Sequence, residues 1–224
     1  MVRFAALSLF VACALAVPTS LSERSGVAYY NPAANGGSML DVSGSLGEPL
    51  NVIISGLSSP SVLASTNALI NYARAIGFST ECFGIHIGTP QTANLGDGQG
   101  QVNQLIELRQ DYGSASLGTC LESVIGGNHF RAWQQSGSLA PSDAWFLAVS
   151  KEEPATQSHN IVPDGYDIGR DALVSGAVGT HSFGGVTYTT TAQNVTGLLS
   201  VGSAGINHGI ALDGIVTVLT VTAS

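Results

Sequence analysis

The stretch Leu50-Asn-Val-Ile-Ile-Ser-Gly-Leu57 begins the part of the chain whose pattern decides the fold. A short run of aliphatic and β-branched residues that ends at a glycine predicts a strand followed by a turn. Ser61 can then cap a helix that Gly77 ends, and apolar residues between them recur at helical spacing: Val62, Leu69, Ile70, Ala73 and Ile76. The sequence therefore predicts a strand and then a helix.

Further elements are expected on the C-terminal side of this unit. They are strands at 83–87, 102–109, 129–134 and 145–149, a helix at 167–176, and strands rich in Val, Thr and Tyr at 186–191 and 214–221. The pattern predicts a single domain over 48–224 of the α/β (α+β) class. We expect a mixed β-sheet with two or three packed helices and a β-rich C-terminal extension over about 176–224. An all-β sandwich is the alternative.

The first residues have the pattern of a secretory signal peptide. A basic start at Arg3 precedes an apolar run over 4–17, which ends near the small-residue cleavage pattern Ala14-Leu-Ala16. We expect a signal peptide over 1–16, followed by an irregular lead-in over 17–47 with one strand near 27–30. The apolar run is shorter than the roughly 20 residues that cross a membrane as a helix. The sequence predicts a secreted, extracellular protein, either free or associated with the cell wall.

The cysteines and one asparagine agree with secretion. Removal of the signal peptide takes away Cys13 and leaves Cys82 and Cys120, which we expect to form a disulfide in an oxidising compartment. Such a bridge would stabilise the fold by roughly 3 to 4 kcal/mol. Two buried free thiols are the alternative. Asn194-Val-Thr196 is an acceptor sequence for N-glycosylation and predicts an exposed segment.

The charge balance limits the partners of the protein. Without Arg3 the chain has six cationic residues against fifteen acidic ones, a formal net charge of −9. Such a surface repels phosphate backbones and anionic lipids, so neither nucleic acid nor a membrane is an expected partner. Any site for an anion must therefore be local.

Two segments concentrate groups that can carry out chemistry. In a strand, His129, Arg131 and Trp133 lie on one face because successive side chains alternate. Residues 158–171 then contain His159, Arg170 and three aspartates, Asp164, Asp167 and Asp171. In a helix Asp167 and Asp171 lie one turn apart, with Arg170 beside them.

Three interpretations of these residues stay open. In the first, Arg131 and Arg170 bind an anionic group while His129 or His159 transfers a proton. In the second, His159 and the nearby aspartates hold a metal. In the third, the arginines pair with aspartates and the histidines are satisfied structural residues. Neither a nucleotide loop nor a Gly-x-Ser-x-Gly elbow is present, and we expect no cofactor.

Several motifs resemble the LssY-type C-terminal domain over roughly residues 48–175. The matching segments are 48–56, 75–78, 107–111, 144–148, the His-x-Arg-x-Trp motif of 129–133 and the stretch from His159 to Asp171 with its Asp-x-x-Arg-Asp motif. The chain also looks like secreted proteins of mushroom-forming fungi. It departs from the bacterial domain, which follows a membrane-bound lipid-phosphatase-like portion, in having Phe78 at the place of a tryptophan and a β-rich end. No phosphatase activity is carried over.

The resemblance implies that His129, Arg131, His159, Asp167, Arg170 and Asp171 belong to one unit. We expect a secreted domain in which these residues bind an anionic small molecule or an acidic glycan, with His129 and His159 as the catalytic candidates if the site is hydrolytic. The alternative is a noncatalytic secreted or cell-wall-associated protein whose charge cluster is structural. The sequence does not decide whether the protein is an enzyme.

Overall fold

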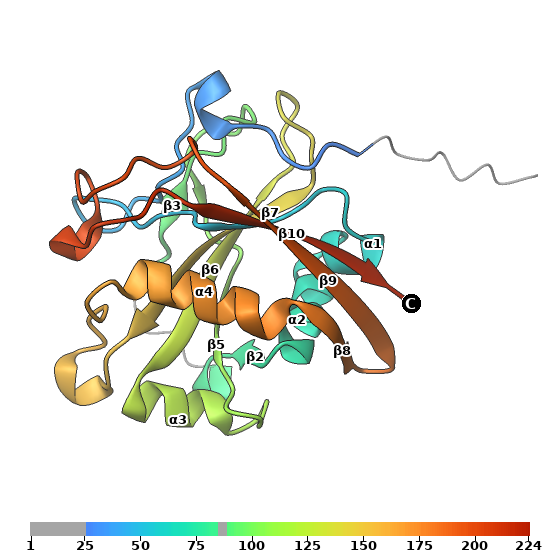
Figure 1. Ribbon diagram of the computed structural model, residues 1–224, viewed down its shortest axis with the longest axis vertical. Coiled ribbons are helices and arrows are strands. Elements are labelled where there is room, and N and C mark those ends of the chain that lie inside the picture. Colours follow the sequence, from blue (N-terminus) through green and yellow to red (C-terminus); the bar gives the residue numbers. More distant parts are fainter. Residues whose placement is uncertain (1–25, 85–88) are drawn as a thin grey trace, which may run out of the picture.

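One curled, mixed sheet forms the centre of the molecule, and the computed structural model describes residues 26–84 and 89–224. The predicted signal peptide, most of the predicted strand 83–87 and His86 lie outside the described residues. The sheet has eight strands in the order β2-β5-β6-β7-β1-β10-β9-β8 (Figure 1). All neighbours are antiparallel except β1 and β10, which are parallel. A single α+β domain with a mixed sheet is therefore confirmed.

The bounds of the strands follow the predicted pattern closely in the middle of the chain. The sheet contains β1 (Val52–Ile54), β2 (Phe78–Thr80), β5 (Ile106–Gln110), β6 (Gly127–Gln135), β7 (Ala144–Glu152), β8 (Gly179–Phe183), β9 (Val186–Val195) and β10 (Val216–Ala223). A separate pair consists of β3 (Thr92–Ala93) and β4 (Val102–Asn103). The predicted strand 102–109 is thus two strands, and the expected strand near 27–30 is not formed.

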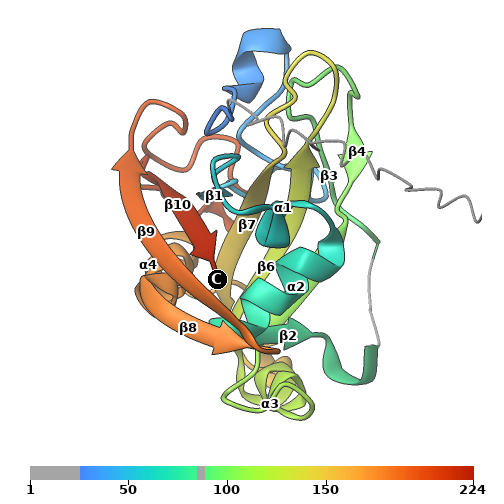
Figure 2. The ribbon, with the colours of Figure 1, turned by 90° about the vertical axis from the view of Figure 1, so that its right-hand side faces the viewer.

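Within residues 26–84 and 89–224, four α-helices accompany the sheet, namely α1 (Pro60–Leu63), α2 (Thr66–Ala75), α3 (Gly118–Ile125) and α4 (Gly165–Ala177). The helix expected from Ser61 to Gly77 is divided, because Ser65 adopts an extended backbone and its Oγ accepts a hydrogen bond from the Ala68 N–H. Ser65 is therefore the N-cap of α2, and α1 is a single turn. α2 packs against β2 and β8, at opposite edges of the sheet, so the sheet curls around it (Figure 2).

β1 lies between two hydrophobic cores, and this explains its unbroken aliphatic sequence. Val52 and Ile54 face one core with Tyr72 of α2. Ile53 faces the other core with Trp133 of β6. A strand that is buried on both faces has no polar side, so the alternation that marks a half-exposed strand is absent.

α4 crosses the end of β7 at a glycine. A Cβ atom on Gly169 would lie 2.7 Å from backbone atoms of Ser150, so only glycine permits this approach. The amide of Asn128 donates to the Gly169 carbonyl, and the amide of Asn51 donates to the carbonyls of Val149 and Tyr166. These contacts fix the first turns of α4 against β6, β7 and the start of β1.

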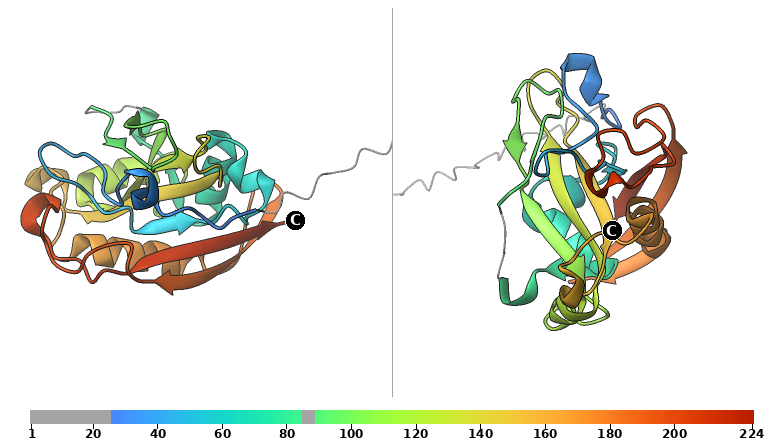
Figure 3. Two further views of the ribbon diagram at one scale, coloured as in Figure 1. Left: turned by 90° about the horizontal axis from the view of Figure 1, so that it is seen from above. Right: turned by 90° about the vertical axis from the view of Figure 1, so that its left-hand side faces the viewer.

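The β-rich C-terminal segment is present and completes the sheet. β8, β9 and β10 run along one side of the molecule (Figure 3), and β10 pairs with β1, where Ile53 is opposite Val218. The two predicted strands rich in Val, Thr and Tyr, β9 and β10, pair with each other in antiparallel orientation. The parallel pairing with β1 joins segments that are far apart in the sequence, and the strand pattern alone does not indicate it.

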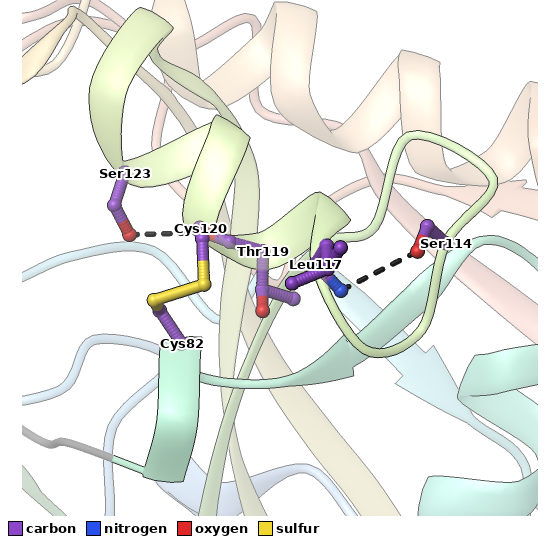
Figure 4. Close-up of a disulfide and its surroundings, with 6 residues drawn as sticks. All are labelled: Cys82, Ser114, Leu117, Thr119, Cys120 and Ser123. Carbon is purple, nitrogen blue, oxygen red and sulfur yellow. Dashed lines mark hydrogen bonds between the residues drawn. A yellow bond between two sulfur atoms is a disulfide. The ribbon is translucent and has the colours of Figure 1, made fainter.

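The predicted disulfide between Cys82 and Cys120 is present and joins the short 3-10 turn Cys82–Gly84 to α3 (Figure 4). It closes a loop with a sequence separation of 38 residues. We expect the double replacement Cys82→Ser and Cys120→Ser to lower the free energy of unfolding by roughly 3 to 4 kcal/mol, because the unfolded chain gains conformational freedom. Urea unfolding of the oxidised protein and the variant measures this difference. Equal stabilities would show that the bridge does not constrain the unfolded chain.

Candidate functional site

β5 and β6 place four charged or titratable side chains in a square on one face of the sheet. Glu107 and Arg109 are two residues apart on β5, and His129 and Arg131 are two residues apart on β6. In the strand register Glu107 is opposite Arg131 and Arg109 is opposite His129. Directly opposite side chains in antiparallel strands are close enough to interact. Carboxylates from other elements complete this group, which we call the β5–β6 cluster: Glu48, Glu81, Glu107, Arg109, Glu122, His129, Arg131 and Glu152.

Arg109 is surrounded by carboxylates. Its Nη1 lies 2.7 Å from Oε2 of Glu152 and 3.1 Å from Oε2 of Glu122, and its Nη2 lies 3.0 Å from Oε1 of Glu107. Its Nε lies 3.5 Å from Oε1 of Glu81. Burial opposes the charge of Arg109, but Glu152, Glu122 and Glu107 raise the pKa of the guanidinium above its usual value. Every side of this guanidinium is therefore occupied by an acid of the protein itself.

Arg131 is held in the same way and also contacts His129. Its Nε lies 3.1 Å from Oε2 of Glu107, and its Nη1 lies 3.2 Å from Oε2 of Glu48. The same Nη1 donates to Nε2 of His129 at 3.0 Å. Because a guanidinium only donates, Nε2 of this histidine must be the unprotonated acceptor nitrogen.

The other ring nitrogen of His129 is also engaged. Nδ1 lies 3.2 Å from the hydroxyl of Ser150 and 3.3 Å from Oε1 of Glu152, so it carries the proton. Burial, and next the positive charge of Arg131, lower the pKa of His129 well below its usual value. The imidazole is fully buried and neutral. It has no free nitrogen with which to exchange a proton with a bound solute.

Acids exceed bases in and around the β5–β6 cluster. Burial raises the pKa of Glu122 to about 7, and burial together with the neighbouring Glu48 raises the pKa of Asp41 to about 8. Burial also raises the pKa of Glu48. Asp41 accepts from the Glu48 N–H with one carboxyl oxygen, while the other has no hydrogen-bond partner. The region therefore holds protons and repels further negative charge.

His159 lies at the edge of the β5–β6 cluster. Its Nδ1 is 3.5 Å from Oε2 of Glu152, and its side chain is about one-third exposed. Its backbone is left-handed, with a φ of 53°. Of the six predicted site residues, His129 and His159 therefore both contact Glu152, and Arg131 joins them through His129.

The other three predicted residues form a second group with Asp213, which we call the α4 cluster: Asp167, Arg170, Asp171 and Asp213. Both terminal nitrogens of Arg170 contact the carboxylate of Asp213, at 2.7 and 2.9 Å. Its Nε donates to Asp171 at 2.8 Å, and its Nη1 donates to the Ile215 carbonyl at 3.0 Å. Asp167 lies 3.3 Å from the guanidinium and also accepts from the Asp213 N–H. The buried guanidinium is thus fully paired.

The two clusters are separate ion-pair networks. Among the described residues, no hydrogen bond or ion pair joins the β5–β6 cluster to the α4 cluster. The sequence indicated neither the acids that neutralise Arg109 and Arg131 nor Asp213. Glu107 and Arg109 could have been found, because they are two residues apart on one strand, as His129 and Arg131 are on the next, and such residues share a face. Asp213 is 43 residues from Arg170, and no local pattern connects them.

The metal-binding and anion-binding interpretations find little support in the geometry. In the described part of the chain, no group of three or more His, Cys, Asp or Glu side chains is arranged to hold a metal. His159 is directed to Glu152, whereas Asp167 and Asp171 are directed to Arg170. A surface groove of about 1090 Å³ lies between the lead-in, α1 and the loop after β6, and none of the six predicted residues lines it.

Two further findings complete the description of the site. No helix within the described residues is long and apolar enough to cross a bilayer. Comparisons with protein-family models, with curated proteins and with solved structures find no match, so the similarity to the LssY-type domain stays a prediction.

Proposed function

We propose that the protein is a noncatalytic secreted module whose buried charge clusters hold its tertiary structure together. The observation that carries this proposal is that the guanidinium groups of Arg109, Arg131 and Arg170 are each neutralised by two or more carboxylates. An anion that entered either cluster would have to displace a carboxylate of the protein and leave it buried without a counter-ion. That exchange is unfavourable, so these arginines stabilise the fold.

Secretion is part of the proposal. The pattern of residues 1–16, the disulfide between Cys82 and Cys120, and the exposed Asn194 within its acceptor sequence support an extracellular location. An N-linked glycan is carried by the amide nitrogen of asparagine. The hydrogen bond of Asn194 with the Thr217 hydroxyl uses the carbonyl oxygen and does not involve that nitrogen. A charge-poor, hydroxyl-rich surface of this kind suits a protein of the extracellular space or the cell wall.

The competing function is a site for an anionic small molecule or an acidic glycan. It would need at least one guanidinium that is accessible and not yet paired. Arg170 has the more exposed partners, because Asp171 and Asp213 are partly in solvent, so it is the better place for a test.

We expect Arg170→Met to lower the free energy of unfolding by about 2 kcal/mol, less than a fully buried pair because its aspartates can turn to solvent. Urea unfolding measures this change. Lys151→Met is the matched control, because Lys151 is an exposed cation on β7 and its loss should change stability by less than about 0.5 kcal/mol.

The wild-type protein and the same two variants also test whether the α4 cluster binds an anion. Isothermal titration of the wild-type protein with inorganic phosphate, sulfate and polygalacturonate is expected to show no saturable binding. Saturable binding of any of these anions that is lost in Arg170→Met and kept in Lys151→Met would overturn the proposal and assign a ligand site to the α4 cluster.

A further inference from the structure

α3 has its polar side inside and its apolar side in solvent. Thr119 and Glu122 are buried against the domain, whereas Leu121, Val124 and Ile125 are 45%, 62% and 49% exposed. Together with Leu117, which precedes the helix, the exposed residues recur with the spacing i, i+4, i+7 and i+8. This spacing forms one continuous stripe on a helix, and such a stripe normally faces a core.

Two aromatic side chains extend the stripe. Phe83 is 80% exposed and follows Cys82, whose disulfide to Cys120 places it beside α3. Tyr112 is 43% exposed, and its hydroxyl donates to the Gly126 carbonyl at the C-terminal end of the helix. We call the resulting surface the α3 patch: Phe83, Tyr112, Leu117, Leu121, Val124 and Ile125.

The inverted orientation of α3 is fixed by its buried side. Glu122 is fully buried and pairs with Arg109, and the disulfide ties Cys120 to the 3-10 turn (Figure 4). Gly118 is in direct contact with the Asp111 carbonyl, where no larger residue fits. The helix cannot roll to bury its apolar stripe without breaking these contacts. The stripe is therefore held in solvent in the single chain.

The size and chemistry of the α3 patch fit a second copy of the chain. From the exposed fractions, its side chains present roughly 600 Å² of surface, near the upper limit for an unoccupied apolar patch on a monomer. Two such surfaces bury about 1,200 Å² in total, which reaches the lower range of specific protein interfaces.

The absence of charge on the α3 patch also favours a second copy of the same patch over a charged partner. The patch has no charged side chain, and its exposed neighbours include the hydroxyls of Ser114 and Ser116. A two-fold axis through the patch brings the uncharged surfaces of two copies together. Anionic lipid would find no Lys or Arg there, and the net charge of −8 would repel it.

We propose that the α3 patch is the interface of a symmetric homodimer, in which α3 of one copy packs against α3 of a second. An interface of this area without charged anchors predicts a dissociation constant in the micromolar range, of the order of 1 to 100 μM.

Sedimentation velocity of the mature, oxidised protein from about 1 to about 500 μM tests this proposal. The wild type is expected to convert from monomer to dimer over this range. Val124→Glu places a charge in the centre of the interface and is expected to weaken dimerisation by at least about 100-fold. Val201→Glu is the matched control, because Val201 is 77% exposed and lies outside the patch. It should dimerise as the wild type does.

The alternatives have distinct outcomes. A wild type that stays monomeric at all concentrations would overturn the proposal, as would equal weakening by Val124→Glu and Val201→Glu. A monomer that floats with phosphatidylcholine vesicles, and loses this property in Val124→Glu, would assign the patch to a neutral lipid surface instead. Near-ultraviolet circular dichroism verifies that each variant is folded, and Leu121→Ser provides a second variant should Val124→Glu unfold.

Discussion

Replacement of Arg109 by methionine is expected to lower the free energy of unfolding by about 4 kcal/mol at neutral pH. The guanidinium is the shared counter-ion of Glu107, Glu122 and Glu152, whose side chains are only 3%, 0% and 7% exposed. Methionine fills a similar volume but leaves Glu122 buried without its counter-ion. It also takes one cationic partner away from Glu107, which keeps Arg131, and from Glu152. Uncompensated buried charge is among the few mechanisms by which one substitution removes a large part of the stability of a domain.

The pH dependence of this loss identifies its cause. Protonation removes the buried negative charges, so the deficit of Arg109→Met should be smaller at about pH 5 than at about pH 7. Adding Glu122→Gln should restore part of the stability, because the carboxylate that lost its counter-ion is then a neutral amide. Urea unfolding followed by the fluorescence of the buried Trp133 and Trp145 provides the measurement. A loss below about 1 kcal/mol, or one independent of pH, would show that Arg109 does not stabilise the cluster electrostatically.

The wild-type protein is expected to become less stable as the pH rises from about 5 to about 8, by roughly 3 kcal/mol or more. Burial raises the pKa of Asp41 from 3.8 to about 8 and that of Glu122 from 4.5 to about 7. A carboxyl whose pKa is raised by folding binds its proton more tightly in the folded state. Its contribution is fully present below the unfolded pKa and is lost as the pH rises through the folded pKa.

Asp41→Asn isolates the larger of these two contributions. Asparagine keeps the oxygen that accepts from the Glu48 N–H but cannot ionise. The variant should match the wild type at about pH 4, exceed its stability at about pH 8, and show a flatter slope between these values. The effect of burial on Asp97 is outweighed by the hydrogen bonds from Gln99, Gly137 and Ser136, which lower its pKa. Asp97→Asn is therefore the control, and it should leave the slope above pH 5 unchanged. A wild type whose stability is constant from pH 5 to 8 would contradict the prediction.

The local elements of the fold could be read from the sequence to a large extent. The alternation in 129–134 and the apolar run in 145–149 indicate β6 and β7, and 167–176 indicates α4. α3 was not expected, although Leu117, Leu121, Val124 and Ile125 recur at helical spacing. That spacing indicates a helix but would place its apolar side in the core, whereas the structure leaves this side in solvent.

The site was predictable only in part. Alternation along β6 correctly places His129 and Arg131 on one face, and helical spacing places Asp167 and Arg170 together. Their neutralising partners were not foreseen, since Glu48, Glu122 and Glu152 come from a loop, a helix and a strand end. Whether a guanidinium is free for a ligand depends on these partners, so the composition of the cluster alone could not decide between binding and stabilisation.

The sequence by itself determined the properties that depend on neighbours along the chain. These are the strands β1, β5, β6, β7, β9 and β10, the helices α2 and α4, the pairing of Cys82 with Cys120, and the acidic charge balance. Only the tertiary structure decided that β10 lies parallel to β1, that Arg170 is paired with Asp213, and that α3 turns its apolar side outward. The physical reason is range. Backbone preference and side-chain periodicity act over a few residues, whereas burial and ion pairing depend on which distant segments come together.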